Sequence, residues 1–198
     1  LFLTDGLPTV GEQEPARILE HVRGRSSASV RLFPFGVGYD VNSALLDALA
    51  QENHGASAYI LPGENLEERV SAFYAKINMP VLANLSLDFG SLVVEDSYPN
   101  PLPDLFLGSQ LVLAGRYRGE GATTVTLRGV VNGQERTYRY EDLTFPGEDT
   151  RRDFLPRLWA TRKIGYLLNE IRLHGENKEV VDEIVELSLR YGIITPYT

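Results

Sequence analysis

Apolar residues alternate between two patterns along the first 78 residues of the chain. Short apolar runs are typical of strands buried on both faces of a parallel sheet. They are LFLT (1–4), SVRLFPFGVG (29–38) and SAYIL (57–61). After each run, apolar residues at helical spacing predict a helix, over 15–22, from Asn42 or Ser43 to near Gly55, and over 65–77. This repeated order predicts an α/β layer with parallel strands.

The pattern changes after residue 78. Residues 81–146 form short, alternating segments rich in β-branched side chains, with turn signals between them. The strongest of these signals is Asn132-Gly133, which is typical of a hairpin. Several strands at this spacing predict a small antiparallel β-sandwich.

The last part of the chain returns to helical periodicity. Apolar stripes over 154–173 and after Asn177 predict two helices that form a hairpin. The first stripe contains Trp159 and is too wide for an isolated helix pair, so we expect a second surface to cover it. The predicted organisation is an α/β domain (1–78), a β-sandwich (79–150) and a helical hairpin (151–198) packed on the sandwich.

Composition narrows the classes of partner. The 198 residues carry a formal net charge of -8, which disfavours nucleic acid, and contain no cysteine, which excludes disulfides and cysteine nucleophiles. No apolar stretch approaches the roughly 20 residues that span a bilayer, so membrane insertion is not expected. A basic face over 152–163 (Arg152, Arg157, Arg162 and Lys163) is interpreted as solvated or as docking another domain, with binding of an anionic ligand as the less favoured alternative.

Oxygen-bearing side chains gather in the loops that follow the three predicted parallel strands. Ligands of such sheets bind outside the carboxyl ends of the strands, and oxygen donors suit Mg²⁺ or Ca²⁺. The candidates are Asp5, Thr9, Glu12, Asp40, Asn42, Glu64 and Asn65. Asn42 and Asn65 also predict helix caps, and Glu12 and Glu64 are expected to be solvated. Asp5 differs because it directly follows a buried strand and precedes a glycine.

Several segments carry a family resemblance over essentially the whole chain. These are LFLTDGLPTVGE, RLFPFGVGYDVN, LLDALAQENHG, LPDLFLGSQLVLAGRYRG, FLPRLWATRKIGYLL and LSLRYGIITPYT. Together they resemble the second half of a von Willebrand factor type A domain and the region that follows it in inter-alpha-trypsin inhibitor heavy chains and their bacterial relatives. The resemblance implies part of a doubly wound parallel sheet, followed by the sandwich and the hairpin. It also suggests a bacterial member.

The resemblance implies a metal-ion-dependent adhesion site built from three loops. Asp5 matches the Asp of the family's Thr-Asp-Gly loop, with Thr9, Asp40 and Asn42 as a candidate rim. The Asp-x-Ser-x-Ser loop and the Thr loop have no match here, so the site is incomplete. Mg²⁺ or Ca²⁺ is therefore expected in the intact protein, and no well-ordered ion at Asp5 in this chain alone.

The implied function is that of a non-enzymatic binding module of the adhesion type, extracellular or in the cell envelope. Its metal would take an acidic side chain of a protein or matrix ligand. One alternative is a structural scaffold with a vestigial metal site, in which the β-sandwich performs recognition. A hydrolase is a weaker alternative, because no nucleophile–base pair is visible and His21, His54 and His174 lie in unrelated segments.

The resemblance also implies that these residues are part of a longer chain. In the family's strand order, 3-2-1-4-5-6, the strand at Leu1–Thr4 lies in the middle of the sheet. An exposed apolar edge invites pairing. We therefore expect this edge to pair with a second copy, with the first half of the domain, or with rearranged local chain.

Overall fold

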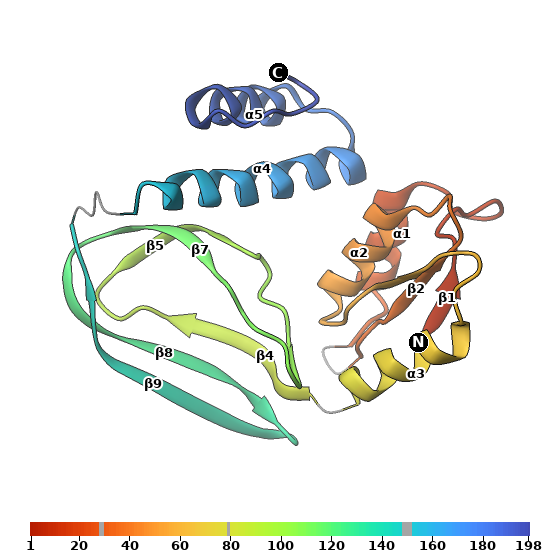
Figure 1. Ribbon diagram of the computed structural model, residues 1–198, viewed down its shortest axis with the longest axis horizontal. Helices are drawn as coiled ribbons and strands as arrows, with labels where there is room; N and C mark the ends of the chain where they lie inside the picture. The colour runs from red at the N-terminus through yellow and green to blue at the C-terminus, as the bar shows by residue number, and fades with distance from the viewer. Residues whose placement is uncertain (28–29, 79, 148–151) are drawn as a thin grey trace. The chain divides into compact units, whose positions relative to one another are not determined.

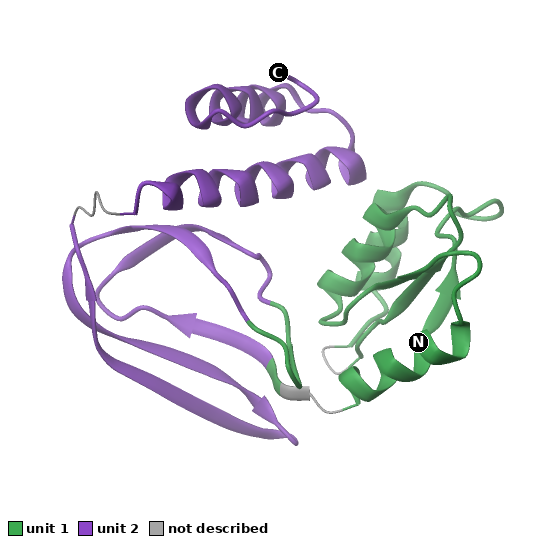
Figure 2. Ribbon diagram, in the orientation of Figure 1, with its two compact units in different colours: residues 1–83, 103–110 green, residues 84–102, 111–198 purple. Residues whose placement is uncertain are grey.

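The computed structural model describes residues 1–27, 30–78, 80–147 and 152–198 of a mixed α/β protein. The chain divides into two compact units, shown in Figure 2. Unit 1 comprises Leu1–Ala83 and Pro103–Gln110, and unit 2 comprises Asn84–Leu102 and Leu111–Thr198. Parallel and antiparallel sheets both occur, as the sequence predicted.

Unit 1 contains the three predicted strand–helix repeats (Figure 1). The elements are β1 (Phe2–Thr4), α1 (Pro15–Arg23), β2 (Pro34–Val37), α2 (Ser43–Glu52), β3 (Ala58–Ile60) and α3 (Leu66–Ile77). All three strands are parallel, in the order β1-β2-β3. The strand β2 is shorter than its apolar run: its paired residues begin at Pro34, opposite Phe2 of β1, and end at Val37, opposite Ile60 of β3.

Local signals account for where these helices begin and end. Pro15 occupies the first turn of α1, where its missing N–H costs nothing. Asn42 Oδ1 accepts a hydrogen bond from Leu45 N (3.1 Å), and Asn65 Oδ1 accepts one from Glu68 N (3.2 Å). The predicted caps of α2 and α3 are thus confirmed. Helix α2 ends at Glu52, slightly before the predicted stop at Gly55.

Aromatic rings pack against one another in unit 1, beside a core of buried leucine and alanine side chains. Phe35 is 1% exposed, and its ring centroid lies 4.8 Å from that of Phe73 on α3. The short strand β6 (Leu105–Phe106) adds Phe106, whose ring centroid lies 5.9 Å from that of Phe33. Strand β1 lies at one edge of the three-stranded sheet. Within the described residues no strand pairs with its outer edge, and Leu1 and Leu3 are about half exposed. The partner expected for this edge stays a prediction.

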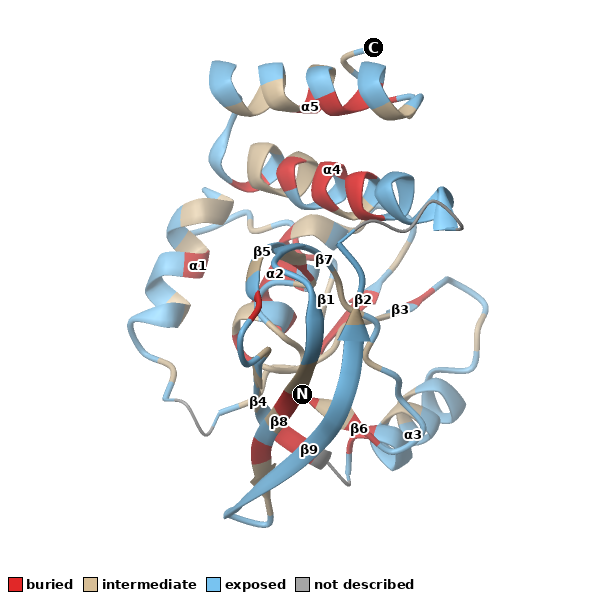
Figure 3. Ribbon diagram, turned by 90° about the vertical axis from the view of Figure 1, so that its left-hand side faces the viewer, coloured by how far each residue is buried: buried red, intermediate tan, exposed pale blue. Residues whose placement is uncertain are grey.

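The remaining strands are antiparallel. A four-stranded sheet has the order β6-β4-β8-β9, with β4 (Pro80–Asp88), β8 (Gly121–Val131) and β9 (Gln134–Phe145). A separate ribbon pairs β5 (Val93–Tyr98) with β7 (Ala114–Arg118). Between β8 and β9, Asn132 and Gly133 both have positive φ, which a type I′ turn requires. The predicted hairpin is therefore confirmed, and Figure 3 shows β9 exposed along almost its whole length.

Two helices complete unit 2. They are α4 (Phe154–His174) and α5 (Lys178–Tyr191), in agreement with the predicted pair. Asn177 Oδ1 caps α5 by accepting hydrogen bonds from Glu179 N and Val180 N. Trp159 is only 6% exposed, in a cluster that joins Tyr98 of β5 to Ile184 of α5. The expectation that a second surface, beyond the helix pair, covers Trp159 is confirmed, and that surface is the β5–β7 ribbon.

Candidate functional site

Asp5 lies in a tight turn directly after β1. Its Oδ1 atom accepts a hydrogen bond from Leu7 N (2.9 Å), while Thr4 Oγ1 accepts one from Gly6 N (3.0 Å). Gly6 has φ +72 and is buried against Leu46, so a side chain there would be strained. The turn therefore holds the Asp5 carboxylate at the surface, at the carboxyl end of the strand.

The loop after β2 meets this turn through its backbone. Asn42 N donates a hydrogen bond to the carbonyl oxygen of Asp5 (2.9 Å). The side chain of Asn42, however, is engaged in capping α2, and its Oδ1 atom accepts from Leu45 N. Of the four predicted site residues, the structure thus brings Asp5 and Asn42 together, although the Asn42 oxygen serves the helix.

The other two predicted residues, Thr9 and Asp40, are both exposed. The backbone oxygen of Thr9 accepts a hydrogen bond from Gln13 Nε2 (3.0 Å) within its own loop. Among the hydrogen bonds and ion pairs of the described residues, none joins Thr9 or Asp40 to the Asp5 carboxylate. The candidate rim around Asp5 stays a prediction.

The nearby glutamates are held within their own loops. Hydrogen bonds from the backbone N–H of Glu14 and of Gln13 keep the pKa of the Glu12 carboxyl below its usual range. Glu64 accepts from Leu61 N and pairs with Arg69, and both interactions lower its pKa. Each remains charged and turned toward its local partner. Within the described ranges, no group of three or more His, Asp or Glu side chains is placed to hold a metal ion.

The histidines do not form a site of their own. His54 Nδ1 lies 3.8 Å from Asp104 Oδ1, but the Asp104 carboxylate is fully buried and Arg31 Nε donates to its other oxygen at 2.6 Å. His174 lies near Glu170 on the same helix, at 3.9 Å. This buried Arg31–Asp104 pair joins β6 to the segment before β2 and is structural.

Unit 2 contains a surface that the sequence did not predict: a groove of about 620 Å³ beside β7. One wall is residues 115–120, which are β7 and the turn after it, and Gly147 adjoins them. The other side is formed by Leu155, Pro156 and Trp159 of α4 with Tyr191 of α5. We call this the β7 groove. All of its lining residues belong to unit 2.

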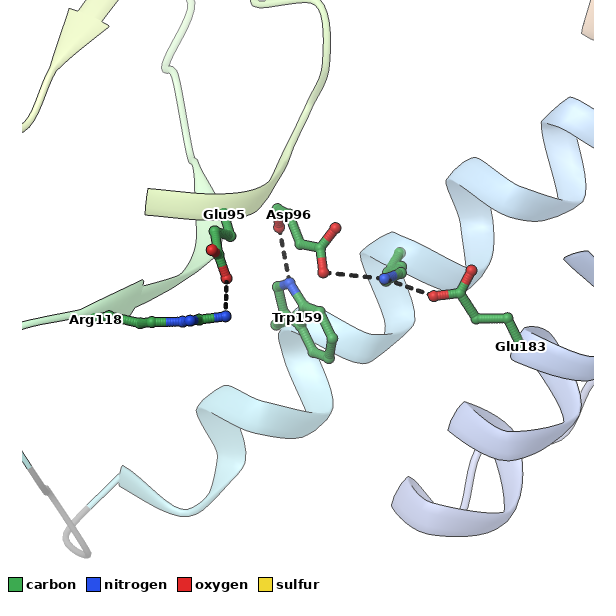
Figure 4. Close-up of polar contacts among 6 residues, drawn as sticks. Glu95, Asp96, Arg118, Trp159 and Glu183 are labelled. Carbon is green, nitrogen blue, oxygen red and sulfur yellow. Dashed lines mark hydrogen bonds and ion pairs between the residues drawn. The ribbon is translucent and has the colours of Figure 1, made fainter. Parts of the chain in front are cut away.

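A polar network fixes the groove's tryptophan (Figure 4). Trp159 Nε1 donates a hydrogen bond to the backbone oxygen of Asp96 (2.8 Å). Lys163 Nζ donates to Asp96 Oδ2 (3.0 Å) and to Glu183 Oε1 (2.7 Å), which ties β5, α4 and α5 together. Burial opposes the charge on Lys163, but these hydrogen bonds outweigh it and raise its pKa.

These contacts show what two residues of the predicted basic face on α4 do. Lys163 is 9% exposed and docks α4 onto β5 and α5, and Arg157 Nη2 donates to the backbone oxygen of Gly192 (3.2 Å). The docking interpretation therefore applies to Lys163, whereas Arg157 contacts the end of its own helical hairpin. The sequence pattern did not predict the β7 groove. Its two sides are brought together only by the pairing of β5 with β7 and by the packing of α4 on both strands. The nearest signal was the unusually wide apolar stripe around Trp159.

The chain is similar over its whole length to inter-alpha-trypsin inhibitor heavy chains. It is 32% identical to heavy chain H4 of Homo sapiens, and 30% identical to both heavy chain H2 of Sus scrofa and heavy chain H3 of Rattus norvegicus. Each comparison covers 100% of this chain but only 22–24% of the relative, so the chain spans less than a quarter of their length. No family model matches the sequence.

These similarities support the relation to heavy chains that the sequence segments indicated. Among the helices described, none is both long and apolar enough to cross a membrane.

Proposed function

We propose that these residues belong to a heavy chain-like, non-enzymatic binding protein. In this proposal, residues 1–78 are the second half of a von Willebrand factor type A domain, and the later strands form a β-sandwich followed by the helical hairpin. The proposal is supported by similarity to heavy chains along the whole sequence and by three parallel strands that are each followed by a helix. An extracellular or cell-envelope location is part of the same proposal.

The proposed activity is metal-dependent adhesion through Asp5. The observation that carries it is the position of this carboxylate, held at the carboxyl end of β1 where a hydrogen bond joins two loops. One carboxylate does not satisfy Mg²⁺ or Ca²⁺, which take six or more oxygen ligands. In the proposal, loops preceding these residues supply the remainder. The bound ion keeps one position for an acidic side chain of a protein or matrix partner.

Isothermal titration with MgCl₂ and CaCl₂ tests this proposal. The protein is the longest native chain that contains Leu1–Thr198, alongside its Asp5→Asn and Glu20→Gln variants. Glu20 is an exposed carboxylate on α1 and serves as the matched control. We expect Asp5→Asn to weaken metal binding at least about tenfold, and Glu20→Gln to leave it unchanged. Equal affinities for all three proteins would rule out Asp5 as a ligand.

A second candidate function is favoured by the β7 groove. Here the metal site is vestigial, the α/β unit is a scaffold, and recognition takes place on unit 2. Absence of any Mg²⁺ or Ca²⁺ binding by the longest native chain, together with ligand binding at the groove, would favour this candidate over metal-dependent adhesion.

A further inference from the structure

We propose that the β7 groove binds an extended, acidic peptide segment of a partner protein. The proposal does not depend on the metal site at Asp5, because every residue that lines the groove lies in unit 2. The groove's volume of about 620 Å³ falls within the range of roughly 300–1,000 Å³ found for ligand sites.

Charge is the first argument for an acidic ligand. Arg116 and Arg118 both line the groove, in a chain whose net charge is -8. The one acidic residue among the lining residues, Glu120, has its carboxylate packed against Gly147. Two arginines and one glutamate give the described lining a formal excess of one positive charge on an acidic chain, and this excess favours a negatively charged partner.

Spacing is the second argument, and it indicates a peptide. Arg116 and Arg118 are two residues apart on β7, so their side chains leave the same face about 6.5 Å apart along the strand. An extended peptide presents its own alternate side chains at the same interval. Acidic residues at positions i and i+2 of such a peptide would each meet one guanidinium group, which binds carboxylates through two parallel hydrogen bonds.

Both arginines are available for this role. The guanidinium carbon of Arg116 lies 5.2 Å from the centroid of the Trp159 ring, which orients the group at the groove. Arg118 Nη2 donates to Glu95 Oε2 at 3.0 Å, but the side chains of this pair are 77% and 46% exposed. Exposed ion pairs contribute little, about 0–1 kcal/mol. A ligand carboxylate can therefore replace Glu95 at small cost.

The other residues that line the groove can accommodate the apolar side chains of an extended peptide. Gly115 and Gly119 contribute only backbone to the wall that also carries Arg116 and Arg118. Opposite it, Leu155 (42% exposed), Pro156 and Tyr191 offer apolar contacts. A peptide that alternates acidic and apolar residues matches both sides.

Trp159 provides a direct probe, because it is the only tryptophan in the chain and it lines the groove. The full 198-residue chain is titrated with the capped peptide Glu-Leu-Glu-Leu-Glu, and with Lys-Leu-Lys-Leu-Lys as the charge-reversed control. Trp159 emission and titration calorimetry are both recorded. We expect saturable binding of the acidic peptide alone, which weakens as NaCl is raised.

Three variants test the arginines. Arg116→Gln is expected to weaken binding at least about tenfold, and Arg118→Gln several-fold, because each removes a charge-assisted contact. Arg128→Gln is the matched control: this arginine lies on β8, outside the groove lining, with a side chain 54% exposed. Arg116 also contacts Trp159, so calorimetry gives the affinity independently of emission, and circular dichroism verifies that each variant is folded.

The proposal is overturned if the acidic peptide does not bind, if the lysine peptide binds equally well, or if Arg116→Gln behaves like Arg128→Gln. It is also overturned if a carboxylated oligosaccharide of equal charge competes as strongly as the peptide, because the groove would then select charge and not an extended backbone. Asp5→Asn should leave peptide binding unchanged, so the failure of one proposal can be distinguished from the failure of the other.

Discussion

The two candidate surfaces differ in how the chain assembles them. At the carboxyl edge of the parallel sheet, each polar side chain is held by its own loop or helix, as with Asp5 and Leu7 or Asn42 and Leu45. In unit 2, Trp159 and Lys163 instead contact Asp96, which is more than sixty residues away in the sequence. The first surface is a product of local turns, and the second exists only when β5, α4 and α5 pack together.

This difference teaches where substitutions should have large and small effects. Unit 2 depends on a few distant contacts that converge on Trp159 and Lys163, so loss of either should be costly. Helix capping depends on local contacts in both units, so a cap should contribute a similar free energy of folding in each unit. The following predictions test the comparison, beginning with the largest effect.

Trp159→Ala should destabilise the protein most, by about 3–5 kcal/mol, because it empties a large volume in the unit 2 core and removes the hydrogen bond to Asp96. Urea unfolding followed by circular dichroism measures the change. Hydrogen exchange should show lost protection in β5, α4 and α5. Leu189→Ala on α5 is the control, since Leu189 is 74% exposed and should change stability by less than about 0.5 kcal/mol. A loss below about 1 kcal/mol for Trp159→Ala would contradict the comparison.

Lys163→Met should have an intermediate effect, about 1–2 kcal/mol at neutral pH. The variant leaves Asp96 and Glu183 without their shared cation, but both carboxylates are partly exposed and can be hydrated. Urea midpoints at a series of pH values measure the difference between the two proteins.

The pH dependence of that difference has a defined sign. The pKa of Lys163 is raised in the folded state above its ordinary value of 10.5. Its contribution is therefore fully present below pH 10.5 and is lost as pH rises through the folded pKa. The gap between wild type and Lys163→Met should stay constant from about pH 7 to 9 and shrink above pH 10.5. Tyr98, whose own pKa is raised by burial, titrates in both proteins, so only the difference is informative. A gap that widens at alkaline pH would show that the ion pairs do not stabilise unit 2.

The smallest effects should come from the helix caps and should be alike in the two units. Asn65→Ala at α3 and Asn177→Ala at α5 each remove a side-chain oxygen that accepts from backbone N–H groups. Each should cost about 1 kcal/mol. Thermal unfolding followed by circular dichroism measures both, and Asn65→Asp and Asn177→Asp, which retain a capping oxygen, should restore most of the loss. A cost above about 3 kcal/mol at one site only would mean that its asparagine does more than cap.

Much of the architecture could be predicted from the sequence because its causes lie within a few residues. The cap at Asn42, the hairpin at Asn132-Gly133 and the helix pair of the tail all depend on neighbouring backbone and on short-range periodicity. The position of Asp5 at the end of a strand follows from the same kind of pattern, as does the burial of Trp159 within its apolar stripe.

Only the tertiary structure decided which distant residues meet. The limits of β2 are set by its pairing with both β1 and β3, and the loops of Asp5 and Asn42 meet because β1 and β2 are neighbours in the sheet. Lys163 could be read from the sequence either as solvated or as a docking residue, and the choice was made by Asp96 and Glu183 on other elements. The β7 groove has no sequence motif, because its two sides are joined by strand pairing and helix packing across long separations. Such contacts depend on how the whole unit folds, and no local pattern of side chains encodes them.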